Sequence, residues 1–148
     1  MNPIQRILVP TDFSTCADAA ADLAAEIARR FQAEVHVVTV VDTAPLYDAY
    51  GNVAFRDERI ADIRGTATRR LDEFTRDRFA GLPVHSDVRD GNTVDEILNA
   101  VRETRSELVV MGTHGRTGLA HLLIGSVAEK VVRHSPVAVT TVRPAPAR

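Results

Sequence analysis

Two kinds of segment alternate along the chain. Short apolar runs rich in β-branched residues have the length of strands and are bounded by Pro, Gly, Asp or Asn. The longer segments between them repeat apolar residues at the i, i+3, i+4, i+7 spacing of an amphipathic helix. The pattern predicts five strands, at residues 4–9, 34–41, 83–88, 107–111 and 137–142.

Four helices are predicted between the strands. The first two cover about residues 15–32 and 60–74, and Gly65 inside the second weakens the prediction that this helix is continuous. Capping-box sequences of the S/T-x-x-E type mark the starts of the other two helices, at Thr93 and at Ser126.

The segment from Pro45 to Phe55 contains both tyrosines, Gly51 and Asn52, and it is long for a connection between a strand and a helix. A surface loop is the simpler expectation for it. A mobile lid is the alternative.

Strands that alternate with helices, with no hairpin turn between them, are parallel and joined by right-handed crossovers. The chain is therefore predicted to be an α/β protein with one doubly wound, Rossmann-like, five-stranded parallel sheet and helices on both faces. In the strand order 3-2-1-4-5 the last strand, from Val137 to Val142, lies at an edge. This strand is uncharged, and an unguarded edge invites pairing with another chain.

Length and composition limit the classes of protein that need to be considered. The 148 residues have room for one domain, residues 1–148, and 45% hydrophobic residues are enough for a packed core. The 18 basic residues are balanced by 20 acidic ones, which argues against nucleic acid as a partner. Lys130 is the single lysine, so nearly all of the positive charge comes from arginine.

Cys16 is the single cysteine, so no internal disulfide can form and nothing favours an oxidising compartment. The longest apolar-rich stretch, residues 35–41, is far shorter than the roughly 20 residues of a membrane-spanning helix. The start of the chain also lacks the apolar run of a signal peptide. We expect a cytoplasmic protein with no membrane partner.

Candidate chemistry lies just after the strands, because open α/β sheets bind ligands at the carboxyl ends of their strands. The fourth strand leads into a glycine-rich stretch that ends at the start of the fourth helix. Glycines there let backbone N–H groups approach a ligand, and a helix N-terminus favours an anion, so the anion implied is phosphate. The stretch is neither a P-loop nor G-x-G-x-x-G, and Lys130 falls inside the fourth helix.

Gly112, Gly115 and Gly125-Ser126 have the spacing G-x2-G-x9-G-[ST]. This spacing resembles the nucleotide-binding signature of ATP-binding members of the universal stress protein family. Three further segments agree with the resemblance, which covers essentially the whole chain: Ile7-Leu8-Val9-Pro10-Thr11-Asp12-Phe13-Ser14, Val40-Val41-Asp42 and Ser135-Pro136-Val137.

The resemblance implies a site for ATP, with Mg²⁺ or Mn²⁺ brought by the nucleotide. At the nucleoside end, Asp12 would accept hydrogen bonds from the ribose hydroxyls, and the backbone of Val40 would pair with the adenine edge. Pro10 and Thr11 would flank the base, and Met111 would line the pocket. Each of these three side chains also has a structural interpretation. Asp12 could be an acid that interacts with the dipole of the following helix, Val40 could be a core strand residue, and Met111 could serve packing alone.

At the phosphate end, the resemblance implies that Gly112, Gly115, Gly125, Ser126 and Val127 hold the phosphates. For Ser126 alone, an N-cap is the structural alternative. Arg116 and His114 lie in the same loop, where a cation could meet phosphate charge, or both could simply be exposed to solvent.

No catalytic set and no metal-ligand spacing is recognisable in the sequence. The remaining histidines show no grouping typical of zinc, and Cys16 is expected to be an inert residue at a helix start. The resemblance implies a stress-responsive, nucleotide-binding regulator that forms a homodimer through antiparallel pairing of the last strand. The alternatives are a slow ATPase or adenine-nucleotide hydrolase and, third, a purely structural dimer with an empty loop.

Overall fold

The computed structural model describes residues 3–114 and 124–144. Its five strands form one parallel sheet in the order β3-β2-β1-β4-β5, as predicted from the sequence. Each strand begins and ends within two residues of the positions expected from the sequence. The strands are β1 (Arg6–Pro10), β2 (Glu34–Val41), β3 (Val84–Asp90), β4 (Leu108–Gly112) and β5 (Ala138–Val142).

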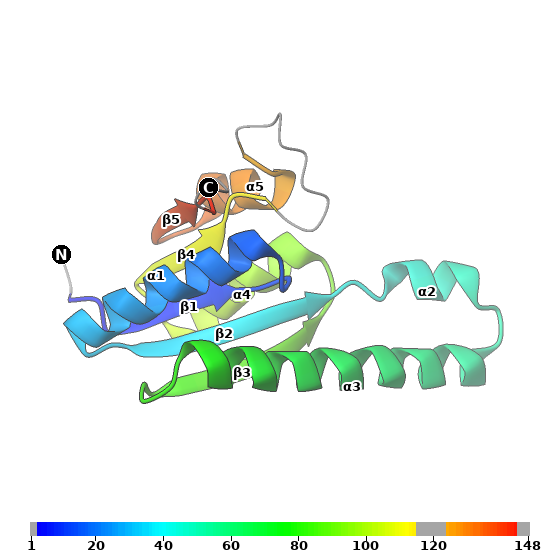
Figure 1. Ribbon diagram of the computed structural model, residues 1–148. Coiled ribbons are helices and arrows are strands. Elements are labelled where there is room, and N and C mark those ends of the chain that lie inside the picture. The colour runs from blue at the N-terminus through cyan, green and yellow to red at the C-terminus, as the bar shows by residue number, and fades with distance from the viewer. Residues whose placement is uncertain (1–2, 115–123, 145–148) are drawn as a thin grey trace.

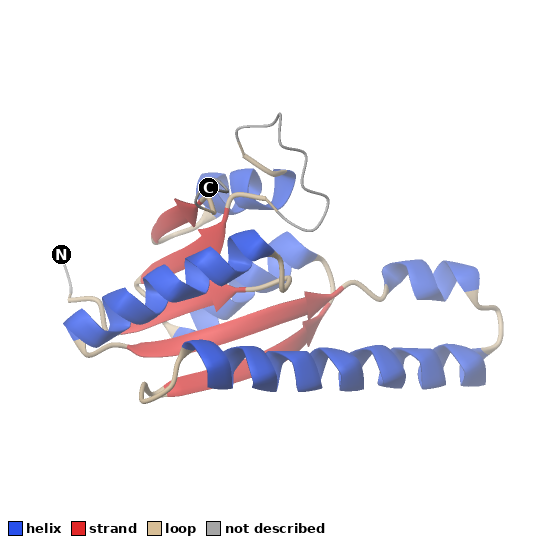
Figure 2. Cartoon of the chain, in the orientation of Figure 1, coloured by secondary structure: helices blue, strands red, loops and turns tan. Residues whose placement is uncertain are grey.

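Helices cover both faces of the sheet (Figures 1 and 2). Helices α1 (Thr15–Phe31) and α3 (Val53–Arg78) pack on one face, and α4 (Thr93–Thr104) and α5 (Ser126–His134) pack on the other. The core is accordingly divided into two clusters of buried side chains, one on each side of the sheet. Central β1 has consecutive fully buried residues because it is covered on both faces.

Both capping boxes are displaced by one residue from the sequence prediction. Asn92 is the N-cap of α4, and its side-chain oxygen accepts hydrogen bonds from the N–H groups of Val94 and Asp95. Gly125 is the N-cap of α5, so Ser126 is the first helical residue. Asparagine is as good an N-cap as threonine or better, which explains the earlier start of α4.

The segment from Pro45 to Phe55 is helical rather than the expected loop. It contains the short helix α2 (Ala44–Ala49) and the beginning of α3, which the side chain of Asn52 caps through the Ala54 N–H. Gly65 does not interrupt α3. Figure 1 shows α2 and the first part of α3 extending past the end of β2, away from the sheet. No helix among the described residues is long and apolar enough to cross a membrane.

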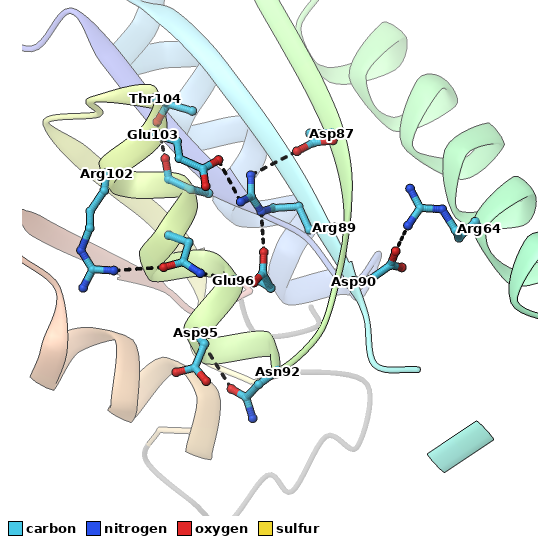
Figure 3. Close-up of polar contacts among 12 residues, drawn as sticks. Arg64, Asp87, Arg89, Asp90, Asn92, Asp95, Glu96, Arg102, Glu103 and Thr104 are labelled. Atoms are coloured by element: carbon cyan, nitrogen blue, oxygen red, sulfur yellow. Dashed lines mark hydrogen bonds and ion pairs between the residues drawn. The ribbon is translucent and has the colours of Figure 1, made fainter. Parts of the chain in front are cut away.

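Arg89 ties the edge strand β3 to α4 (Figure 3). Its side chain is 13% exposed, and the guanidinium donates hydrogen bonds to Glu96 and Glu103, each at 2.9 Å, and to Asp87 at 3.2 Å. Burial lowers the pKa of Arg89, but the hydrogen bonds to Glu96 and Glu103 outweigh burial and raise it above its ordinary value. Arg89 therefore stays charged and holds α4 in place beside the sheet.

Glu107 ties the start of β1 to the start of β4. Its carboxylate accepts hydrogen bonds from the backbone N–H groups of Arg6, at 2.7 Å, and Gln5, at 3.1 Å. The side chain of Arg6 also donates to it, at 3.1 Å. Burial raises the pKa of Glu107, but these hydrogen bonds outweigh burial and leave the pKa below its ordinary value.

We expect Glu107→Gln to lower the free energy of unfolding by about 2 kcal/mol at neutral pH, because a charge-assisted pair of hydrogen bonds is lost. A carboxyl whose folded-state pKa is lowered stabilises the fold above its unfolded pKa, and this contribution is lost as pH falls through the folded pKa. Urea unfolding should therefore show a difference in the free energy of unfolding between wild type and Glu107→Gln that shrinks below about pH 4. Exposed Glu26→Gln is the control, with a small effect throughout. A Glu107→Gln deficit independent of pH would contradict the prediction.

Candidate functional site

The carboxyl ends of β1, β2 and β4 open into a cavity of about 510 Å³, at the point where the strand order reverses. Its volume lies in the usual range for small-molecule sites. The nine predicted site residues that the structure describes all line it: Pro10, Thr11, Asp12, Val40, Met111, Gly112, Gly125, Ser126 and Val127. Gly115 and Arg116 lie outside the described residues.

The loop after β1 holds Asp12 at the mouth of the cavity. The Oδ1 atom of Asp12 accepts a hydrogen bond from the Ser14 N–H at 3.0 Å, and Ser14 in turn caps α1 through the Ala17 N–H. The Thr11 N–H bonds to the Val38 carbonyl at 2.8 Å, and Thr11 Oγ1 accepts from the Phe13 N–H. Phe13 has a left-handed backbone with φ of 63°. A tight, fully bonded turn thus orients the Asp12 carboxylate.

Gly112 allows close contact between the end of β4 and the first turn of α1. A Cβ atom at this position would lie 2.7 Å from the Cβ of Cys16 and 2.9 Å from its carbonyl carbon. The glycine is therefore required by packing, in addition to any contact with a ligand. Cys16 is buried behind it, which agrees with the expected inert role.

Gly125 closes the base of the loop that leaves β4. Its N–H donates to the Thr113 carbonyl at 2.6 Å, and a Cβ atom on Gly125 would lie 2.9 Å from the same oxygen. Thr113 is itself fixed, because its N–H donates to the Val142 carbonyl of β5 at 2.9 Å. His114 follows, with Nδ1 3.0 Å from Thr113 Oγ1. The two ends of the loop are thereby held together beside the cavity.

The start of α5 lines the cavity, and no side chain in the described part of the chain caps it. By contrast, α1, α3 and α4 are capped by Ser14, Asn52 and Asn92. The first N–H groups of an uncapped helix lack acceptors within the helix and carry its positive dipole end. The described lining residues include no Lys or Arg. Among the described lining residues, an anion would therefore meet mainly backbone N–H groups.

Part of the cavity wall is apolar. Val38, Ile97 and Met111 are buried there, and Val40 is partly buried. The apolar faces of a flat aromatic ring fit such a wall. Residues that the sequence did not assign to the site complete the lining: Ala17, Val38, Thr93, Ile97, Thr113 and Ala128.

No group of three His, Cys, Asp or Glu side chains is arranged to hold a metal ion within residues 3–114 and 124–144. His36 and His85 stack on each other on the neighbouring strands β2 and β3, with ring centroids 5.0 Å apart. Neither histidine lines the cavity.

Residues 3–143 match the model of the universal stress protein family. The chain belongs to the universal stress protein family. The family that the glycine spacing resembles is thus confirmed. A universal stress protein from Methanocaldococcus jannaschii is 34% identical over 142 residues, which are 93% of this chain and 82% of that protein.

Two solved structures share the fold. A second protein from the same archaeon, 24% identical, superposes with a TM-score of 0.86 and covers 99% of this chain and 100% of its own. A universal stress protein solved in complex with cAMP is 25% identical, with a TM-score of 0.74, and covers 97% of this chain and all of its own.

Proposed function

We propose that this universal stress protein is a cytoplasmic regulator that binds ATP in the cavity between β1, β2 and β4. The observation that carries the proposal is the start of α5, which no described side chain caps and which lines the same cavity as the Asp12 carboxylate. Phosphates bind at the helix start, where N–H groups and the dipole attract an anion. The nucleoside then extends toward Asp12 and the apolar wall.

The adenine nucleotide bound by a relative of the same fold supports the assignment of ligand class. In this chain Asp12 accepts hydrogen bonds from the ribose hydroxyls, and the backbone of Val40 pairs with the adenine edge. Pro10, Thr11 and Met111 enclose the base. Gly112, Gly125, Ser126 and Val127 line the phosphate end, and Gly115 and Arg116 complete the motif in sequence.

Asp12 is the one acidic side chain among the described lining residues. Mg²⁺ or Mn²⁺ would therefore be held by phosphate oxygens and water rather than by a protein cage. Its contribution is to neutralise phosphate charge. The chain's own residues bind and orient the nucleotide.

A slow ATPase or adenine-nucleotide hydrolase is the second candidate, favoured by His114 at the cavity wall. Phosphoryl transfer to water also needs a positioned nucleophile and charge compensation. Unhydrolysed ATP recovered after incubation supports the regulator. Metal-dependent turnover that is lost in His114→Ala supports the hydrolase.

We also propose a homodimer through the outer edge of β5, the strand predicted from Val137 to Val142. The Val142 carbonyl accepts a hydrogen bond from the Thr113 N–H, on the β4 side of the strand. Backbone N–H and C=O groups of successive strand residues point to alternate sides, so the N–H of Thr141 points to the outer edge. An unpaired edge offers donors and acceptors to a second chain. Sedimentation of the wild-type protein as a monomer at high micromolar concentration would oppose this interface.

Calorimetric titration with ATP and Mg²⁺ tests the proposed function, and we expect Asp12→Asn to raise the Kd for ATP by about 10- to 100-fold. Asparagine keeps the oxygen that accepts from Ser14, so the loop is preserved. It loses charge-assisted hydrogen bonds to the ribose worth about 1.5–3 kcal/mol.

The matched ligand is 2′,3′-dideoxy-ATP, which has no ribose hydroxyls for Asp12 to bind. Both proteins should bind this nucleotide with the same affinity. An equal loss for ATP and dideoxy-ATP would show that Asp12 acts on the loop instead. Absence of ATP binding by the wild type would remove the proposed function altogether.

A further inference from the structure

The arm, residues 44–58, consists of α2 and the first part of α3 and projects beyond the sheet (Figure 1). Four of the seven large hydrophobic side chains that are exposed in the described part of the chain lie on it. Their exposed fractions are 56% for Tyr47, 39% for Tyr50, 57% for Val53 and 65% for Phe55. Clustered exposed apolar side chains mark an interaction site.

A second cavity of about 540 Å³ lies at the base of the arm, between α3 and the carboxyl ends of β1 and β2. We call it the groove. Its apolar lining includes Phe13, Val41 and Ile63. Residues spaced three or four apart along α3 form its helical wall: Arg59, Asp62, Ile63, Thr66, Ala67 and Arg70.

The arm carries three acidic side chains and one basic one, Arg56, and the groove offers two arginines beside two acids of its own. Arg59 and Arg70 lie at the two ends of the helical wall, and neither forms an ion pair with a described carboxylate, while the Arg70 guanidinium lies 4.4 Å from the centroid of the Phe13 ring. Asp48 and Glu58 of the arm likewise have no ion-pair partner among the described residues. Asp62 and Asp12 are the acids of the groove itself.

The arm cannot occupy the groove of its own chain. Phe55 precedes Arg59 and Ile63 by four and eight residues on the same continuous helix, about 12 Å along the axis from Ile63. Phe55 of the arm and the helical wall of the groove therefore belong to one rigid helix. The side chains that fill the groove must come from another molecule. When two copies are related by a two-fold axis, the arm of each copy can contact the groove of the other.

We propose that two copies of this chain pair reciprocally, with the apolar tip of each arm docked in the groove of the other. The aromatic side chains of the arm cover the apolar lining, and its acids meet Arg59 and Arg70. This interface lies away from the β5 edge, so the two pairings do not exclude each other, and a chain that makes both assembles beyond a dimer. The groove also shares Asp12 and Val40 with the nucleotide cavity, so, resting on the proposed function, the partner's arm borders the nucleotide site.

Sedimentation of the full chain without nucleotide tests the proposal independently of ATP binding. Thr141→Pro removes the outward N–H of β5 and blocks edge pairing. We expect this variant to remain a dimer at high micromolar concentration. Adding Phe55→Lys, which brings a cation to the cationic rim, should yield a monomer. The control Phe31→Lys alters a phenylalanine at the far end of α1 that is 56% exposed, close to the 65% of Phe55, and should leave the dimer intact.

A Thr141→Pro protein that is folded by circular dichroism but monomeric would overturn the proposal, as would equal effects of Phe55→Lys and Phe31→Lys. Arg59→Glu should weaken the dimer by about tenfold, and Glu58→Arg added to it should restore the affinity. Failure of that rescue would overturn the charge pairing. If ATP fails to bind while the arm dimer forms, the proposed function is wrong and the docking stands.

Discussion

Ser126→Asp is expected to weaken ATP binding by at least about 100-fold while leaving the fold as stable as before or more so. Ser126 is the first residue of α5, is exposed and lines the cavity. An acid in the first turn of a helix interacts favourably with the dipole, by about 0.3–1 kcal/mol. The same carboxylate would occupy the proposed phosphate site, where like charges cost several kcal/mol, and each 1.4 kcal/mol is about tenfold in affinity. Binding and stability should therefore change in opposite directions.

Titration calorimetry and thermal unfolding of the same preparation measure the two effects. Ser126→Ala is the matched control and should lose less than about tenfold, because the hydroxyl contributes one hydrogen bond and the backbone N–H groups remain. Adenosine, which has no phosphate, should bind wild type and Ser126→Asp alike. Undiminished ATP binding by Ser126→Asp would show that phosphates do not bind at α5.

The central strands of the sheet could be predicted from the sequence because they are buried on both faces. Ile7, Leu8 and Val9 are fully buried in succession, which gives a continuous apolar run instead of an alternating one. The arm was not predicted because it packs on no sheet. Val53 and Phe55 face solvent, so the first turns of α3 carry no core periodicity, and only the Asn52 cap signals the start of the helix.

The strand-end residues of the site follow from one topological rule, and so could be predicted before any coordinates. Thr93 and Ile97 could not, because α4 follows β3 in sequence and reaches the cavity only by packing across β1 and β2. The glycines have a second role that spacing does not reveal. Gly112 and Gly125 each lie so close to neighbouring backbone that a Cβ atom would be below 3.0 Å from it.

Packing at Gly112 leads to the second large effect, a loss of about 3 kcal/mol in the free energy of unfolding for Gly112→Ala. The new Cβ would lie 2.7 Å from the Cys16 Cβ, 2.9 Å from the Cys16 carbonyl carbon and 3.1 Å from the Ala17 nitrogen. Two of these are backbone atoms of the first turn of α1, so relief requires the helix to move away from β4. Ala17 and Gly112 both line the nucleotide cavity, so the movement should also weaken ATP binding.

Urea unfolding measures the loss, and Gly65→Ala is the matched control. Gly65 lies inside α3, where an added Cβ meets only the Arg69 guanidinium at an ordinary 3.6 Å. Alanine is favoured over glycine in a helix interior by about 1 kcal/mol, so this variant should be more stable than wild type. The two Gly→Ala changes are thus expected to change the free energy of unfolding in opposite directions. A Gly112→Ala protein of wild-type stability that binds no ATP would instead mean that Gly112 contacts the ligand and does not limit the packing of α1.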